Sequence, residues 1–238
     1  MSGPGVHPGT GLPTWRGRIV PHVTAWSGEQ VDPITRPFGY VTRDDGREYL
    51  TYEHAEVSGL AAGSPLLEQR DLFGLLWFSG HDRPGVGEPQ FAIVHAQRQR
   101  DCMIGRRCQV CGTPFPRGGP VTFLVPEHVV PEDGRPFETA HPPVCGPCRP
   151  YALVQCPHLR QVPFAWVVAR AYRPTGVLAD LYVPDRGTGG IDEETGVVLP
   201  LGHVLLRYAV TKQLRVTVRS YTVEPAAPHR ADRGPGRR

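Results

Sequence analysis

Two Cys-x-x-Cys pairs constrain this chain more than any other feature of its sequence. The pairs are Cys108 with Cys111 and Cys145 with Cys148, and 33 residues separate them. Two residues between cysteines allow both thiolates to face one metal from a tight turn, and two such pairs complete a tetrahedral zinc site. Because four sulfurs leave no coordination position for water or substrate, the pattern predicts a structural zinc rather than a catalytic one.

Disulfides, a redox-active Cys-x-x-Cys motif and reduced core thiols are the alternatives to zinc. The first residues are rich in Gly and Pro, without the basic start and apolar segment of a secretory signal. We therefore expect a cytoplasmic protein in a reducing compartment, where disulfides are rare. The repeated pair favours zinc over a redox motif and over unligated thiols.

The residues around the two pairs indicate a local fold. Gly112 follows the first pair, where a zinc knuckle requires a residue that tolerates positive φ. Residues 121–125 have the β-branched and aromatic composition of a short strand. Pro147 and Pro150 suit the first turn of a helix that begins at the second pair. The order of knuckle, strand and helix resembles a treble clef, so the expected fold class is α+β, a single mixed domain with an embedded treble-clef-like zinc module of four cysteines.

Two cysteines lie outside the paired motifs. Residues 89–104 are expected to form a helix with Cys102 on its apolar face, so Cys102 is interpreted as a packed core thiol. Cys156 follows Cys148 by eight residues, about 12 Å along a helix, which is too far to share one zinc. One alternative stays open, a second site built from these two thiols and two nearby imidazoles: Cys102, Cys156, His158 and His141.

The expected domain organisation is one mixed domain between two disordered ends. Residues 1–14 and the Pro- and Arg-rich residues 224–238 have too little apolar surface to pack, so both are predicted to be disordered. Residues 15–223 should form the α+β domain, with the zinc module at about 102–158. With 28 Gly and 27 Pro, the domain must contain many loops.

Apolar periodicity assigns the elements outside the zinc module. Residues 44–46, Asp-Asp-Gly, form the predicted turn of a hairpin over 38–52. Residues 203–214 carry apolar side chains at helical spacing and are predicted to form a helix. Strands or extended segments are expected at 19–26, 162–172, 176–183, 197–201 and 215–223, with a turn-rich loop at 184–196.

The charge of the chain gives little support to a broad nucleic-acid surface. The formal net charge is +3, and residues 224–238 contribute +2 of it. Four candidate nucleic-acid-binding arginines nevertheless precede the first Cys pair: Arg98, Arg100, Arg106 and Arg107. They could contact phosphates. Alternatively, they could offset the net charge of −2 that four thiolates place on a zinc ion.

Several functional classes lack their sequence signatures. No apolar run approaches the roughly 18 residues required to span a bilayer. The chain also has no phosphate-binding loop, dinucleotide fingerprint or nucleophile elbow. We therefore expect neither a membrane partner nor a dinucleotide cofactor.

Five short motifs between residues 94 and 160 form a distinctive set. They are VHAQRQR at 94–100, CM at 102–103, CQVCG at 108–112, HPPVC at 141–145 and CPHLR at 156–160. Together they resemble an uncharacterised family of zinc-finger-like proteins from high-GC actinobacteria and their mobile elements, over about a third of the chain. The resemblance implies a metal site of four cysteines and no particular reaction.

An acidic-His-x-x-Pro string, Glu127-His128-Val129-Val130-Pro131, lies between the two Cys pairs. It is similar to the string of His-Asn-His nucleases, which also use a treble clef. This resemblance implies His128 as the general base that activates water, with a second metal held near Glu127. The chain departs from the pattern because it contains no Asn. Residues 149–151, Arg-Pro-Tyr, also stand where those enzymes usually supply a His or Asn ligand.

Three functional hypotheses follow from these patterns. The first is a zinc-binding interaction module, for nucleic acid or protein, without catalytic residues. The second is a divergent His-Asn-His-like nuclease that uses His128. The third is an enzyme in which zinc only stabilises the fold and the pocket lies elsewhere. We prefer the first because the predicted zinc site is closed and the nuclease motif is incomplete.

Overall fold

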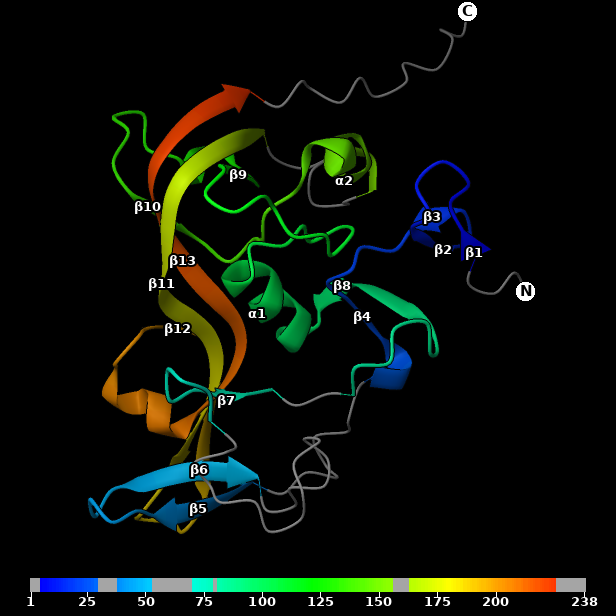
Figure 1. The fold of residues 1–238 in the computed structure, drawn as a ribbon. Helices are drawn as coiled ribbons and strands as arrows, with labels where there is room; N and C mark the ends of the chain where they lie inside the picture. Colours follow the sequence, from blue (N-terminus) through cyan, green and yellow to red (C-terminus); the bar gives the residue numbers. More distant parts are fainter. Residues whose placement is uncertain (1–4, 30–37, 53–69, 79–80, 156–162, 226–238) are drawn as a thin grey trace, which may run out of the picture.

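The fold is organised around one long antiparallel ribbon of two strands. The computed structural model describes residues 5–29, 38–52, 70–78, 81–155 and 163–225. Strand β11 (Phe164–Pro184) pairs with β13 (Ala209–Pro225) from Ala165 opposite Pro225 to Leu181 opposite Ala209 (Figure 1). Both strands are rich in Val, Ala, Thr and Tyr. Apart from Ala, these side chains suit a pleated, half-buried surface.

Shorter strands extend the ribbon differently toward its two ends. Where β11 begins, β9 (Val121–Pro126) pairs with it, and β10 (Phe137–Thr139) pairs with β13. Toward the opposite end, β12 (Ile191–Pro200) pairs with β11, and β7 (Leu76–Trp77) joins β13 in parallel. Strands β9 and β10 therefore lie on opposite sides of the ribbon and pair with different strands.

The alternation of side chains gives this sheet two faces with different neighbours. The inner face forms the main core, around Phe123, Val167 and Val216. Helix α1 (Ala96–Ile104) adds Ala96 and Met103 to this core. The buried side-chain amide of Gln99 donates to the Leu214 carbonyl and accepts from the Leu214 N–H, both at 2.9 Å, so α1 also completes part of the edge of β13.

The outer face of the sheet has a cover at each end. Near the start of β11, Leu124 and Trp166 pack in a second cluster with the Cys-containing module. Toward the other end, Val210 packs in a third cluster with the hairpin of β5 (Phe38–Thr42) and β6 (Glu48–Tyr52). Figure 1 shows the hairpin and helix α2 of the Cys module at opposite ends of the ribbon. The predicted hairpin over 38–52 is thereby confirmed.

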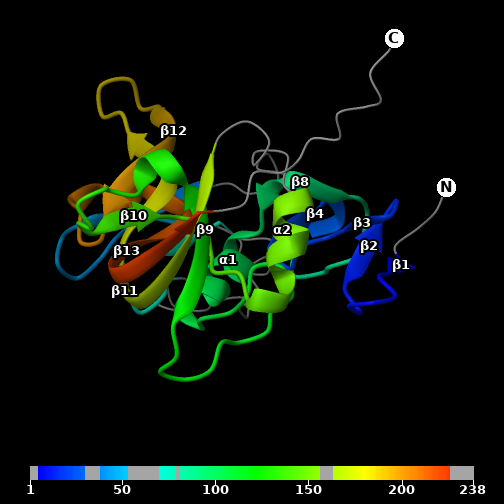
Figure 2. The same cartoon turned by 90° about the horizontal axis from the view of Figure 1, so that it is seen from above.

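The N-terminal residues form a small sheet beside the Cys module. Strands β1 (Gly5–Val6), β2 (Pro13–Trp15) and β3 (Arg18–Ile19) pair in sequence order, and they lie next to α2 in both Figure 1 and Figure 2. Ile19 joins the second cluster, and the His7 ring lies 5.6 Å from the Tyr151 ring. The expectation of disorder over 1–14 is therefore wrong for residues 5–14, because these contacts hold them against the domain.

Residues 89–104 do not form the single predicted helix. Strand β8 (Pro89–Val94) pairs with β4 (Thr24–Trp26), which the short helix η1 (Ser27–Glu29) follows. Only α1 is helical, and its N-cap is His95, whose ring Nδ1 accepts a hydrogen bond from the Arg98 N–H at 3.4 Å. Pairing with a strand about 65 residues away overrides the helical periodicity of residues 89–94.

The C-terminal third contains more strand than expected. Only η8 (Val204–Tyr208) is helical within 203–214, because β13 begins at Ala209 and pairs with β11. Strand β11 runs unbroken where two strands were expected, β12 replaces much of the predicted loop at 184–196, and β13 extends to Pro225 inside the supposed tail. Of the described residues, 15% are helical and 47% lie in strands, so the expected α+β fold class holds only in part: the fold is mostly β, with few helices.

Candidate metal centre

The first Cys pair lies on a tight knuckle between α1 and β9. An isolated bridge between Arg107 and Pro114 closes the loop, and the Cys108 N–H donates to the Thr113 carbonyl at 2.9 Å. At the turn, the Gly112 N–H donates to the Cys108 carbonyl at 2.8 Å. Gly112 has φ +73°, which confirms the predicted need for a glycine here.

The second Cys pair begins a helical segment, as expected. Cys145 is extended, with φ −74° and ψ 158°, and the short helix η6 (Gly146–Cys148) leads into α2 (Arg149–Gln155). Pro147 occupies the first turn, where its missing N–H costs little. The Cys148 N–H donates to the Cys145 carbonyl at 3.0 Å, so this turn orients both thiols the same way.

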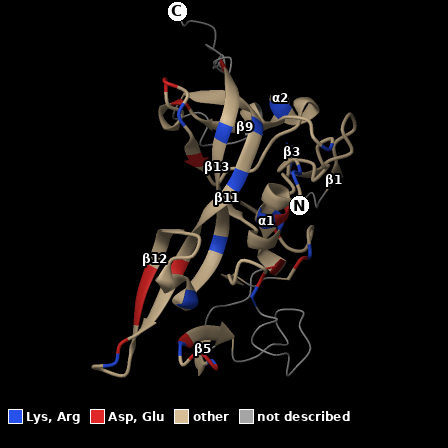
Figure 3. Ribbon diagram, turned by 60° about the vertical axis from the view of Figure 1, so that its left-hand side comes forward, with Lys and Arg blue, Asp and Glu red and all other residues tan. Residues whose placement is uncertain are grey.

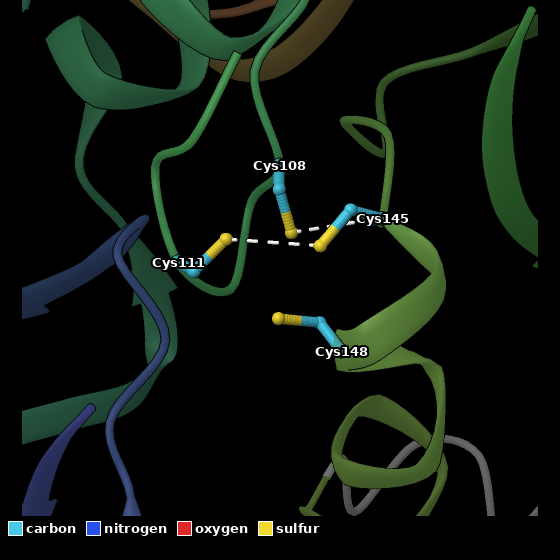
Figure 4. Close-up of side chains that lie close together, drawn as sticks. All are labelled: Cys108, Cys111, Cys145 and Cys148. Carbon is cyan, nitrogen blue, oxygen red and sulfur yellow. Dashed lines mark hydrogen bonds between the residues drawn. The ribbon is translucent and has the colours of Figure 1, made fainter. Parts of the chain in front are cut away.

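The four thiols converge on one point. Their sulfur atoms all lie within 4.8 Å of one another, and the sulfurs of Cys111 and Cys145 are 3.7 Å apart. Figure 4 shows the four sulfurs facing a common centre from the knuckle on one side and the η6–α2 segment on the other. Tetrahedral zinc with Zn–S bonds of about 2.3 Å requires sulfur separations of roughly 3.8 Å. These four cysteines can therefore bind a metal ion, with spacing suited to zinc.

Backbone groups are already arranged to stabilise a thiolate at Cys108. Its sulfur accepts hydrogen bonds from the Val110 N–H at 3.4 Å and from the Cys145 N–H at 3.3 Å. Burial nevertheless raises the pKa of Cys108 to about 12, and burial together with the neighbouring thiols also raises the pKa of Cys148. A metal must therefore displace protons from these thiols, which makes metal affinity pH-dependent.

Backbone hydrogen bonds join the two halves of the site to the rest of the domain. The Gln109 N–H donates to the Pro143 carbonyl at 2.8 Å, and the Val144 N–H donates to the Thr122 carbonyl of β9 at 2.7 Å. On the other side, the His22 N–H donates to the Val110 carbonyl at 2.9 Å. The Cys module is therefore embedded in the sheet and the N-terminal segment rather than attached as a separate finger.

The chemistry of the donor set indicates a closed, structural site. Cys108 and Cys148 are buried and Cys111 and Cys145 are half-buried, so the side chains largely shield the centre from solvent. Four thiolates form the ligand set of structural zinc and leave no open position for a substrate. The site fits zinc, and its role would be to connect segments that are far apart in the sequence.

Of the additional thiol and imidazole groups, the two that the structure describes, Cys102 and His141, do not join this centre. Cys102 is completely buried, its sulfur lies 3.8 Å from the Cys108 carbonyl oxygen, and burial raises its pKa to about 12. His141 is exposed. Among the described residues, neither belongs to a group that could bind a metal. Cys102 is thus a core thiol, as predicted, while Cys156 and His158 lie outside the described residues.

The structure corrects the assignment of Arg98 as a phosphate-binding residue. Arg98 is only 3% exposed. Its guanidinium pairs with both carboxylate oxygens of buried Glu29 at 2.6 and 2.7 Å, with Asp82 at 2.5 Å, and donates to the Thr24 carbonyl at 2.8 Å. Burial alone would lower the pKa of Arg98, but the hydrogen bonds and charge of Glu29 raise it. All of these contacts serve the fold.

The other three predicted arginines differ in their environments. Arg100 is half-buried with its guanidinium 5.4 Å from the centre of the Trp77 ring, and Arg106 is half-buried and donates to the Gly119 carbonyl. Arg107 is exposed, and its guanidinium donates to the Gly112 carbonyl of the knuckle at 3.2 Å. Arg107 is therefore placed to offset the charge of a metal–thiolate centre, which was the alternative interpretation.

A second group of possible metal ligands is already neutralised. Glu29, Asp82 and His95 bring ligand atoms within 4.8 Å of one another, but the Arg98 guanidinium lies between the carboxylates. His95 accepts from the Arg98 N–H through Nδ1, so its Nε2–H donates to the His81 carbonyl at 3.3 Å. Burial, followed by the charge of Arg98, lowers the pKa of His95. Sequence reasoning missed this cluster because its members have no common spacing or motif.

The two nuclease-like residues do not form a site among the described residues. Glu127 and His128 are exposed on the short helix η5 (Glu127–Val129) after β9. Neither belongs to a group of potential metal ligands within the part of the chain that the structure describes. A second metal at this position would therefore need ligands from elsewhere.

Comparisons with known proteins add no family assignment. No family model, curated protein or solved structure matches this chain. Within the described residues, no helix combines the length and apolar character needed to cross a membrane.

Proposed function

We propose that this protein is a structural-zinc protein whose β scaffold acts as an interaction module for nucleic acid. The observation that carries the zinc assignment is the convergence of Cys108, Cys111, Cys145 and Cys148 within 4.8 Å. The order of knuckle, β9 and the η6–α2 helix supports a treble-clef-like description of the module. Membership of the zinc-finger-like family that the motifs resemble stays a prediction.

The nucleic-acid part of the proposal rests on the kind of basic residue present. The chain has 26 basic residues, and all except Lys212 are arginine. Guanidinium groups bind phosphates in a bidentate, planar manner that ammonium groups cannot match. Among the described residues, the second group of possible metal ligands is Glu29, Asp82 and His95, and Arg98 already pairs with its carboxylates. This group is therefore not available to hold a catalytic metal, which favours a binding role over a hydrolytic one.

Two measurements test the proposal together. Elemental analysis of the purified full chain should give one zinc per chain. A pulldown from host extract, compared with a nuclease-treated sample, should retain nucleic acid only in the untreated sample. Retention of a protein partner that survives nuclease treatment, without nucleic acid, would instead favour a protein-binding module.

A further inference from the structure

One stretch of the outer sheet face carries arginines without carboxylate partners. We define the open face as the outward side chains of residues 168–175 on β11 and 215–222 on β13. Tyr172 points to the inner face, where its hydroxyl donates to the Met103 carbonyl at 2.8 Å, and Val218 is fully buried in the main core. Arg173, the neighbour of Tyr172, therefore points outward, and Arg219, the neighbour of Val218, is likewise exposed.

Two irregularities in strand pairing concentrate arginines on the open face. Ala169 pairs with Tyr221 and Ala171 with Ser220, which leaves Arg170 as an extra residue on β11. The next pair is Tyr172 with Val218, which leaves Arg219 as an extra residue on β13. Bulges of this kind redirect side chains, and here residues 170–171 and 219–220 are all exposed.

The resulting array has a defined geometry. Arg170 and Arg219 lie on neighbouring strands, about 5 Å apart in the pairing direction, and Arg173 follows about 10 Å further along β11. Figure 3 shows Lys and Arg positions following one another along β11 and β13. Among the described residues, no carboxylate forms an ion pair with Arg170, Arg173 or Arg219, so within that part of the chain these three charges are unpaired.

Paired arginines flank these three on both sides. Arg149, the residue after Cys148, donates to Glu224 at 2.8 Å and to the Thr122 hydroxyl at 3.0 Å, and its guanidinium lies 4.9 Å from the centre of the Trp166 ring. At the other side, Arg215 pairs with Glu138 of β10 at 3.2 Å. The array therefore begins at the metal module and continues along the ribbon with an excess of positive charge.

We propose that the open face binds the phosphate backbone of double-stranded DNA, an inference that rests on the nucleic-acid function proposed above. Rigid strands hold the guanidinium groups at separations that span more than one phosphate. Two exposed hydroxyl side chains lie among them as further phosphate donors, Ser220 and Thr222.

The composition of the open face distinguishes duplex DNA from other polyanions. None of the large apolar side chains that are exposed on the described surface lies on it, so it offers no anchor for a protein hot spot or a lipid bilayer. No aromatic ring is exposed there, although stacking of bases on such rings is typical of single-strand binding. Residues 226–238 carry four Arg and one Asp, so their positive charge does not complement the positively charged open face.

A salt titration of DNA binding tests this inference. Fluorescence anisotropy would follow binding of the full zinc-loaded chain to a labelled mixed-sequence duplex of about 30 base pairs. The test variant combines Arg170→Gln, Arg173→Gln and Arg219→Gln. The matched control combines Arg83→Gln, Arg117→Gln and Arg186→Gln, three exposed arginines away from the open face that lose the same charge. Zinc content and melting temperature confirm that both variants fold.

The expected result is a specific loss of salt dependence. Each phosphate contact contributes about 0.9 to the slope of log K against log salt, so the test variant should lose up to ~2.7 of that slope. A fourfold rise in salt should then weaken wild-type binding about fortyfold more than it weakens the test variant. The control should retain the wild-type slope.

Three other outcomes would overturn the inference. If the wild type binds duplex DNA and the test variant keeps the wild-type slope, the open face is not the contact surface, although the proposed function stands. The same assay would be run with a single-stranded oligonucleotide of the same length and with poly-glutamate as competitor. If the wild type binds either of these more tightly than duplex DNA, the proposed ligand is wrong. If the wild type binds no nucleic acid at all, the proposed function fails as well.

Discussion

Replacing Arg98 by methionine should destabilise the protein strongly, although it removes no predicted metal ligand and no surface charge. Methionine has similar reach but no donors. The change would leave the Glu29 carboxylate, whose side chain is 1% exposed, without its two guanidinium bonds at 2.6 and 2.7 Å. Removal of one partner from a buried ion pair typically costs about 3–5 kcal/mol, because the other charge stays buried.

The structure places the expected cost toward the lower part of that range. Glu29 keeps two backbone donors, the Trp26 N–H at 2.8 Å and the Arg83 N–H at 3.0 Å, and these continue to stabilise its charge. We therefore expect a loss of about 3 kcal/mol in the free energy of unfolding. For a chain of this size, that corresponds to a fall in melting temperature of about 6–12 °C.

Urea and thermal unfolding of the zinc-loaded protein would measure the effect. The control is Arg100→Met on the same helix, which removes a half-buried guanidinium stacked 5.4 Å from the Trp77 ring and should cost about 1 kcal/mol or less. Combining Arg98→Met with Glu29→Gln removes both charges and keeps an oxygen that can accept from a backbone N–H, so it should recover part of the loss. An Arg98→Met cost no larger than the control, or a double variant worse than both singles combined, would refute the reasoning.

Three further predictions concern the thiols and the nuclease-like residue. Cys108→Ser should lower zinc content and melting temperature far more than Cys102→Ser, and the chelator sensitivity of both variants checks this; equal behaviour would show that the division of the cysteines is wrong. Burial raises the pKa of Cys102 in the folded state to about 12, so the unfolded state loses this proton first as pH rises. The free energy of unfolding should therefore fall above about pH 9, by up to ~1.4 kcal/mol per pH unit. Urea titrations of Cys102→Ala should show a shallower decline between about pH 9 and 11. Plasmid incubated with magnesium or manganese should stay intact, and cleavage that disappears in His128→Ala would restore the nuclease hypothesis.

The sequence predicted the four-cysteine centre well because its information is local. Each pair of ligands lies within one turn of chain, and the coordination number of zinc requires the two pairs to meet. Gly112 and the helix start at the second pair are also set by neighbouring residues. A sequence does not usually reveal that two distant segments meet. Here the requirement of zinc for four ligands was the reason to expect that the two Cys pairs lie together.

The fold was predicted less well because several elements depend on distant partners. Residues 209–214 show helical spacing in isolation, yet they pair with β11 and β7, and residues 89–94 pair with β4. Arg98 shows the same effect for a single side chain. Its neighbours in sequence suggest a basic surface, but Arg98 is buried because its guanidinium pairs with Glu29, 69 residues earlier. Local charge and periodicity contain no signal for such contacts.

The position of Arg149 connects the metal centre to the surface that we propose binds DNA. Arg149 follows the ligand Cys148 directly and extends over Trp166 to Glu224 on the outer face of the ribbon. The metal therefore need not touch a partner to affect binding, because it fixes the helix that carries the first arginine of the array. Arg170, Arg173 and Arg219 instead stand on the β11–β13 ribbon, whose backbone pairing does not involve the metal ligands. Loss of zinc should consequently weaken DNA binding through the Arg149 end and through overall stability, whereas the three ribbon arginines should remain correctly placed for as long as the main core stays folded.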